Sequence, residues 1–451
     1  MEAAVSLNNL KVKVTNRQIL SIALPITLAM LIPQINMLTN SIFLGQLSTE
    51  ALGNAGITGV FYLIFAVAGN GVNTALQTVL SKYAGSGNST AFNAILAQGI
   101  RIALQFSIGC ILFTWLLAPF IMQAISDPVA YPVQMDYLKI RIFGLPFLFL
   151  FQLGNAFLVA SLNSRWLMIG FVFEALLNIL FDYLLIFGKG GFPKMGFNGA
   201  ALASVIAEAS GMLVVLLVIV ITGIRKRYGL LTNLKFNRLF NREILRISIP
   251  LVVQYVLSTT TWLVFFLLIE ARGTMAKAVS NVMRNVIGIS GIFIWAFAST
   301  CSSMVSNLLG QQQTQQVIPL VKRIMYWSLG CCAFMVLLLN LAPEILFSIF
   351  GQSTAFADAA TPVIRVVSVG MLFMSTSLIW LNAVTGTGKT TANLIIELVA
   401  ISLYLIYTWF FMKYNYVSLS WAWSNEFIYW LSILIMSMIF MYRGRWKTKT
   451  T

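Results

Sequence analysis

The sequence contains no histidine and few charged residues. Without histidine, imidazole proton relays and histidine-ligated metal sites are excluded. Only 9% of the 451 residues are charged, whereas a soluble protein carries roughly 25%. The four cysteines all lie in apolar stretches and form no C-x-x-C motif, so we interpret them as packing residues: Cys110, Cys301, Cys331 and Cys332.

Long hydrophobic runs dominate what is present, since 59% of the residues are hydrophobic. A transmembrane helix needs about 20 apolar residues, and the sequence predicts an all-α membrane protein with 12 transmembrane helices. The first 18 residues are polar and basic, and no small-residue cleavage site follows, so the first run should remain as an anchor. The predicted spans are 18–44, 55–80, 93–123, 130–160, 165–188, 197–224, 243–270, 280–308, 320–350, 358–385, 391–412 and 418–442.

The net charge of +16 orients the chain in the membrane. With the N-terminus inside, 20 lysines and arginines fall in cytoplasmic segments and five in outer loops. This positive-inside bias predicts a multi-pass protein of the cytoplasmic (inner) membrane with both termini cytoplasmic. The basic residues therefore indicate membrane orientation and no nucleic-acid partner.

The two halves of the chain resemble each other. "ILSIALPI" at 19–26 recurs as "ILRISIPL" at 244–251, and further matches keep an offset of 225 or 224 residues. Six helices in each half place both halves in the same orientation, related by an axis along the membrane normal. We predict an N-terminal six-helix bundle at 1–224, a basic cytoplasmic connector at 225–242 and a C-terminal six-helix bundle at 243–451.

The stretch "AVTGTGKT" at 383–390 fits a relaxed phosphate-binding P-loop pattern. A P-loop follows a short buried strand, but this motif follows a 19-residue apolar run that we expect to span the membrane. Lys389 also falls opposite Arg165 in the internal repeat. We therefore interpret the motif as a cytoplasmic turn and predict no ATP binding, which argues against an ATP-using enzyme or pump.

The fifth predicted helix carries the strongest candidate site. Glu174, Asn178 and Asp182 are spaced i, i+4 and i+8, so they lie along one helix face. A carboxylate in mid-membrane costs about 2.5–3.5 kcal/mol or more, so this face should point into the bundle. Burial favours the protonated form of Asp182 and would allow it to exchange protons. The alternative is a structural ion pair, for example between Asp182 and Arg141.

Three acids are candidates in the second half: Glu270, Glu397 and Glu426. Glu397 is the deepest of them and is the possible accessory acid of the second bundle. Glu270 closes the seventh helix, where it could pair with Arg272 or Lys277 at the outer surface.

Two stretches resemble the multidrug and toxic compound extrusion (MATE) transporters. They are "ALPITLAMLIPQINMLTNSIFLGQLSTEAL" at 23–52, similar to the family's first helix, and "FEALLNILFDYLLIFGKGGFPKMGFNGAALASVIAE" at 173–208, similar to its fifth and sixth. The resemblance implies two pseudo-symmetric six-helix bundles in a V shape, with cargo exchanged for H⁺ or Na⁺.

The resemblance also implies a cation site. Asn178 and Asp182 match the family's Asn-x-x-x-Asp pair, Ser204 falls at its hydroxyl ligand, and Asn155 matches a further polar member. The family commonly has an aspartate where this sequence has Asn40. One carboxylate instead of two favours protons over sodium, although Asn40, Asn178, Ser204 and Asp182 could supply oxygens to Na⁺.

We therefore predict a secondary antiporter, not an enzyme, that exports amphipathic or cationic organic compounds by alternating access. It should need no cofactor and no other metal, and its partners should be small organic substrates and membrane lipids, with the protein a monomer. The alternatives are a lipid-linked saccharide flippase of the same superfamily and a channel. Flippases line their cavity with Arg and Lys, whereas basic residues within these spans are few.

Overall fold

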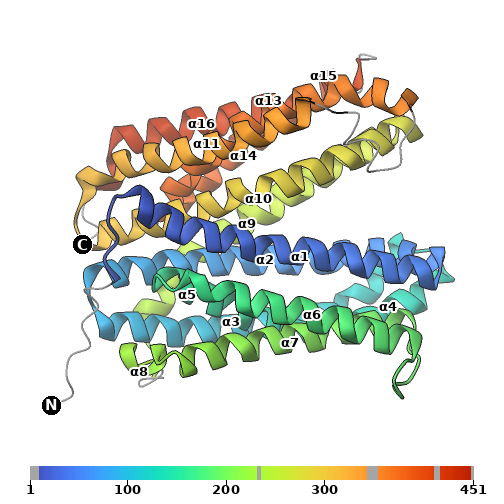
Figure 1. The fold of residues 1–451 in the computed structure, drawn as a ribbon, viewed down its shortest axis with the longest axis horizontal. Helices are drawn as coiled ribbons and strands as arrows, with labels where there is room; N and C mark the ends of the chain where they lie inside the picture. The colour runs from blue at the N-terminus through green and yellow to red at the C-terminus, as the bar shows by residue number, and fades with distance from the viewer. Residues whose placement is uncertain (1–9, 231–234, 342, 344–353, 411–416, 448–451) are drawn as a thin grey trace. The chain divides into compact units, whose positions relative to one another are not determined.

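The computed structural model describes residues 10–230, 235–341, 343, 354–410 and 417–447, and every regular element in these ranges is a helix (Figure 1). Within the described ranges, 12 helical segments are long and apolar enough to cross a membrane. The predicted all-α membrane fold is thereby confirmed, and so is the number of spans.

The first six spans use seven α-helices and two 3-10 turns. They are α1 (Asn16–Leu47), α2 (Thr49–Ser86), α3 (Ser89–Ile125), α4 (Ala130–Arg141), which the 3-10 turn η2 (Ile142–Gly144) joins to α5 (Leu145–Ala160), α6 (Leu167–Phe187) after the turn η3 (Ser164–Trp166), and α7 (Phe197–Ile221). The short helix α8 (Ile224–Tyr228) follows.

The last six spans follow the same plan. They are α9 (Arg238–Glu270), α10 (Thr274–Gly310), α11 (Val317–Leu341) after the turn η4 (Thr314–Gln316), α13 (Thr354–Gly386), α14 (Thr390–Trp409), and α16 (Asn425–Arg443) after the short helix α15 (Leu419–Trp423). The turn η6 (Arg445–Lys447) ends this part of the chain. The predicted spans 320–350 and 391–412 run partly into residues outside the described ranges.

Polar caps set helix ends that the apolar runs do not reveal. The Ser48 hydroxyl accepts the N–H of Ala51 at 2.9 Å and begins α2, and Gly87 ends it in the left-handed region at φ 74°. The Asn88 side chain then accepts the N–H of Ala91 at 2.9 Å and begins α3. Several helices are therefore longer than the predicted spans, because their polar ends continue beyond the apolar stretch.

The outer faces of many helices carry exposed apolar side chains. Leu116, Phe120 and Ile221 are 66%, 72% and 80% exposed. Exposed apolar surface on this scale would be unfavourable in water but matches a lipid environment.

By packing, the described chain divides into two compact units. The first consists mainly of Leu24–Val252, and the second holds Val12–Ala23 and the described part of 253–451. The opening turns of α1 are thus assigned to the second unit, and those of α9 to the first. The predicted halves at 1–224 and 243–451 concern the sequence repeat and stay a prediction.

Hydrogen bonds hold the segment before α1 within the second unit. The N–H of Val12 donates to Asn307 Oδ1 at 3.1 Å, and Gln311 Nε2 donates to the Val12 carbonyl at 3.1 Å. Arg323 Nη1 donates to the carbonyl of Val14 at 2.9 Å. The start of α1 is therefore fixed to α10 and α11.

In the first unit, α6 and α7 form a close hairpin that positions the candidate site. The N–H of Met195 donates to the Leu185 carbonyl at 2.8 Å and folds the connection back onto α6. At Gly199, an added Cβ would lie 2.7 Å from the Leu185 carbonyl carbon, so only glycine allows this approach. The polar faces of α6 and α7 consequently lie against each other.

Candidate functional site

Asp182 lies in the middle of a polar group that α1, α6 and α7 build within the first unit. Its side chain is fully buried, and Asn40 Nδ2 on α1 donates to Asp182 Oδ2 at 3.2 Å. Two residues that are distant in the sequence are therefore brought together, as the family resemblance implied. Asn40 presents its N–H to the carboxylate, so its own oxygen points elsewhere.

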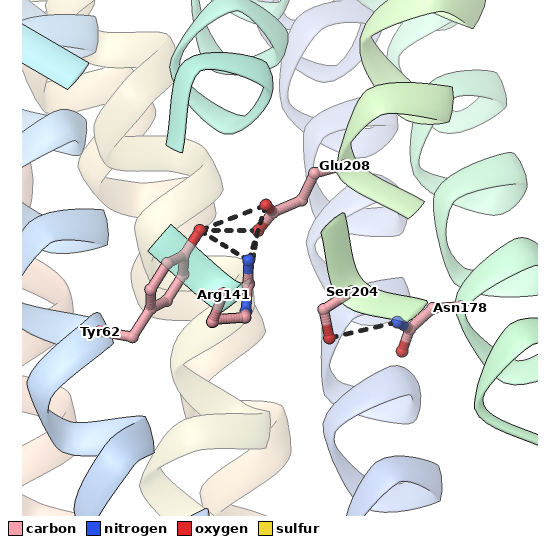
Figure 2. A network of polar contacts seen from close by, with 5 residues as sticks. All are labelled: Tyr62, Arg141, Asn178, Ser204 and Glu208. Atoms are coloured by element: carbon pink, nitrogen blue, oxygen red, sulfur yellow. Dashed lines mark hydrogen bonds and ion pairs between the residues drawn. The ribbon is translucent and has the colours of Figure 1, made fainter. Parts of the chain in front are cut away.

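Asn178, one turn before Asp182 on α6, connects the carboxylate to α7. In one orientation its amide nitrogen donates to Ser204 Oγ at 3.4 Å (Figure 2). When the amide is turned over, its nitrogen donates to Asn36 Oδ1 at 2.7 Å and to Asp182 Oδ2 at 3.2 Å, while its oxygen accepts the N–H of Ser204 at 3.2 Å. The turned orientation satisfies both ends of the amide.

The two carboxylate oxygens of Asp182 are not equivalent. Oδ2 faces the amides of Asn40 and Asn178. Oδ1 is buried and has no hydrogen-bond partner among the described residues. A buried acceptor without a partner is unfavourable, most of all when charged. A proton or a small cation on Oδ1 would remove that penalty.

Asn36 is a member of this group that sequence reasoning missed. It lies one turn before Asn40 on α1, so helical spacing from Asn40 would have indicated it. Asn155, on α5, is 9% exposed, and its Oδ1 has no hydrogen-bond partner among the described residues. Among the described residues, the Asn155 side chain makes no hydrogen bond to Asp182 or to the polar side chains around it.

A second polar network lies on the same face of α7, one turn from Ser204. Arg141, at the end of α4, donates to both oxygens of Glu208, at 2.6 and 2.8 Å (Figure 2). Tyr62 on α2 donates to the same carboxylate at 3.0 Å and accepts from Arg141 at 2.9 Å. The guanidinium carbon also lies 3.7 Å from the centre of the Tyr62 ring.

The alternative in which Arg141 forms an ion pair with Asp182 is not what the structure shows. The partner of Arg141 is Glu208, and both side chains are nearly buried, at 12% and 6% exposed. Gly144 in the turn after α4 makes room, because an added Cβ there would lie 2.6 Å from Arg141 Nη1. Sequence reasoning missed Glu208, although its spacing of four from Ser204 places both on one helix face.

The remaining first-half candidate, Glu174, stands apart from both networks. It is half-buried on α6 beside Gly211 of α7, where an added Cβ would lie 3.2 Å from the Glu174 Cβ. It makes no hydrogen bond or ion pair with the described residues. It therefore lies along the predicted face but has no fixed partner there.

In the second unit, Glu397 on α14 is the centre of a compact polar cluster. The hydroxyls of Ser258 on α9 and Tyr429 on α16 both donate to its Oε1, and Gln254 Nε2 approaches Oε2 at 3.4 Å. Glu397 is only 1% exposed. Both of its oxygens therefore have donors, unlike those of Asp182.

The other two second-half acids differ from Glu397. Glu426 is buried and accepts a hydrogen bond from Trp430 Nε1 at 2.8 Å. Glu270 ends α9, and its side chain lies outside the described part of the structure.

The "GTGKT" stretch lies between two long helices. α13 ends at Gly386, Gly388 adopts φ 75°, and α14 begins at Thr390. An added Cβ on Gly386 would lie 2.7 Å from the Ser302 carbonyl oxygen, so this glycine allows α13 to pack against α10. The strand that precedes a phosphate-binding loop is replaced here by a 33-residue helix.

Residues 25–184 and 250–410 each match the sequence family described as MatE. The matches begin 225 residues apart, which is the spacing of the internal repeat. A probable multidrug resistance protein, NorM, of Thermotoga maritima is 22% identical over 440 residues, covering 96% of this chain and 93% of that protein. An FAD transporter of Shewanella oneidensis is 30% identical over 172 residues, 37% of each chain.

Solved structures share the fold. An outward-facing multidrug resistance MATE transporter of the MOP superfamily matches with a TM-score of 0.86 and 16% identity, over 98% of this chain and 97% of that one. A MOP superfamily transporter from Pyrococcus furiosus matches with the same TM-score, 14% identity and the same coverage. Because the family match covers most of the sequence, this chain belongs to the MATE family of membrane transporters.

Proposed function

We propose that this transporter is a cation-coupled antiporter that exports amphipathic or cationic organic compounds by alternating access. The observation that carries the proposal is the asymmetry of Asp182. Amides hold one oxygen in place, while the other is buried without a hydrogen-bond partner among the described residues. An ion that binds there neutralises a buried charge and changes the relative stability of the transporter's states.

Protons are the coupling ion that this geometry favours. Sodium needs several oxygens and gains from each added negative charge. Asn40 turns its N–H toward Asp182, so it adds no oxygen on that side, and the group contains a single carboxylate. One carboxylate is sufficient for a proton. Asn36, Asn178 and Ser204 then serve to orient Asp182, and we assign Asn155 to the proposed pathway as a further polar residue.

We assign the second-half acids an accessory part. Glu397 has a donor at each oxygen, so it is already satisfied and would exchange an ion less readily than Asp182. Glu174 has a weaker claim, since it has no hydrogen-bond or ion-pair partner among the described residues, and Glu270 stays a candidate from the sequence alone. No cofactor or ATP enters this cycle.

The charge distribution supports an inner-membrane location with both termini in the cytoplasm. The transporter would work as a monomer surrounded by lipid, with small organic molecules as cargo. The alternative is a lipid-linked saccharide flippase, which needs free cations for a pyrophosphate. Arg141 does not serve this purpose, because Glu208 already neutralises it within the first unit.

The test is efflux of a fluorescent organic cation such as ethidium from proteoliposomes, under pH and sodium gradients imposed separately. The proposal expects concentrative export with the pH gradient alone. Robust export under a sodium gradient at equal pH, with a protonophore present, would show that sodium is the coupling ion. If neither gradient changes the efflux, the proposal that the protein is a cation-coupled antiporter is wrong.

A further inference from the structure

Three arginines at the start of α9 form an exposed row within the first unit. Arg238, Arg242 and Arg246 are spaced four residues apart, so their side chains lie on one helix face. All three are exposed, and none makes a hydrogen bond or ion pair with the described residues. We call these three residues the arginine stripe.

The opposite face of the same turns is buried. Ile244, Ile247 and Leu251 are 0%, 7% and 1% exposed, so the helix packs on that side and turns the arginine stripe outward. The preceding segment is also held in place, because Gln98 Nε2 donates to the Lys235 carbonyl at 3.0 Å. The stripe is therefore presented on a fixed helix.

Among the described residues, no acidic side chain forms an ion pair with the stripe. Glu243 is the only acid between 209 and 269. It lies on another side of α9, where Lys82 Nζ approaches it at 2.9 Å and the Tyr83 hydroxyl donates to it at 2.9 Å. Moreover, the first turn of α9 contains no acid, so the positive end of the helix dipole adds to the arginine charges.

The stripe borders an open hollow of about 500 Å³. Phe236, Leu245 and Ile249 line it together with the arginines, and Phe236 and Ile249 are 62% and 58% exposed. Along α9, Leu245 lies between Arg242 and Arg246, and the exposed Ile249 lies beyond the last arginine, in the direction of the span. This order matches a lipid, whose phosphate lies at the membrane surface and whose acyl chain lies deeper.

We propose that the arginine stripe binds the phosphate headgroup of an anionic phospholipid, with its acyl chain along Leu245 and Ile249. Three neighbouring cations without a counter-charge attract an anion, and the apolar lining favours a lipid over a soluble phosphate. This role is additional to the general preference for basic residues on one side of the membrane, because it needs these three positions together.

The test is native mass spectrometry of the full-length protein in detergent with equal amounts of phosphatidylglycerol and phosphatidylcholine. Wild type should retain phosphatidylglycerol selectively. Each Arg→Gln change should weaken its binding about fivefold, and the triple variant of the stripe roughly a hundredfold. The matched control removes the same charge from exposed residues elsewhere, with Lys11→Gln, Lys13→Gln and Arg17→Gln.

Equal retention of both lipids by wild type would overturn the proposal, as would an equal loss in the stripe and control variants. If millimolar inorganic phosphate displaced the lipid completely, the ligand would be a soluble anion and the lipid assignment would be wrong. Should the triple variant fail to fold, Arg242→Gln alone must still show the fivefold loss. Arg242→Lys, which keeps the charge, should retain most of the binding.

Discussion

Replacing Asp182 by asparagine separates the coupling role of this residue from its structural role. The asparagine oxygen can still accept from Asn40 and Asn178, which donate to Asp182 Oδ2 in the wild type. The variant also avoids burying a charge, so it should fold and remain monodisperse. What it loses is the group that alternates between a charged and a neutral form.

The size of the effect follows from the driving force. A pH difference of about one unit supplies about 1.4 kcal/mol for each exchanged proton. One-for-one exchange would therefore concentrate cargo about tenfold, because about 1.4 kcal/mol corresponds to a factor of ten. Asp182→Asn should reduce this ratio to one, even where cargo still equilibrates down its own gradient.

The assay is the steady-state ratio of ethidium across proteoliposomes at a fixed pH difference. Asp136→Asn is the matched control, because the Asp136 side chain is 60% exposed and pairs with Lys139 at the surface, at 3.4 Å. The control should keep the wild-type ratio. A tenfold ratio in Asp182→Asn would refute the coupling role and make Glu397 the next residue to test.

Three further variants test the neighbouring features. Glu208→Gln should lower the free energy of unfolding by about 3–5 kcal/mol, because it leaves Arg141 buried without a counter-charge. Adding Arg141→Met should restore most of the lost stability. Equal thermal stability of the single and double variants would contradict the ion pair. Lys389→Ala should leave efflux nearly intact, whereas saturable ATP binding that this variant abolishes would show that the motif binds nucleotide. Asn40→Asp should make efflux respond more strongly to sodium gradients, since a second carboxylate beside Asp182 attracts cations, and an unchanged response would argue against sodium access to this site.

The membrane-spanning architecture could be predicted because the bilayer sets a simple length requirement. Each run of about 20 apolar residues predicts one helix, and all twelve are helices in the described ranges. Helix ends were less predictable. At α2, for example, Ser48 and Gly87 are the caps, and the polar turns next to them carry no hydropathy signal.

The candidate site was predictable along one helix but not between helices. The spacing of Asn178 and Asp182 places both on one face, and the structure brings them to Asn40. The partner of Arg141 could not be inferred in this way, because periodicity gives the face of a helix and not its neighbour. Both Glu208 and Asp182 could have been the ion-pair partner of Arg141 on sequence grounds. Only the tertiary packing shows that the partner is Glu208.

The position of Val12 has a consequence for biosynthesis. The N–H of Val12 donates to Asn307, which the ribosome makes 295 residues later. At about 5–20 residues per second, the segment waits for tens of seconds before its partner exists. During that interval the opening turns of α1, with the buried Ile19 and Ile22, need temporary cover from lipid or the insertion machinery. This segment is thus made well before the residues that fix it in the second unit.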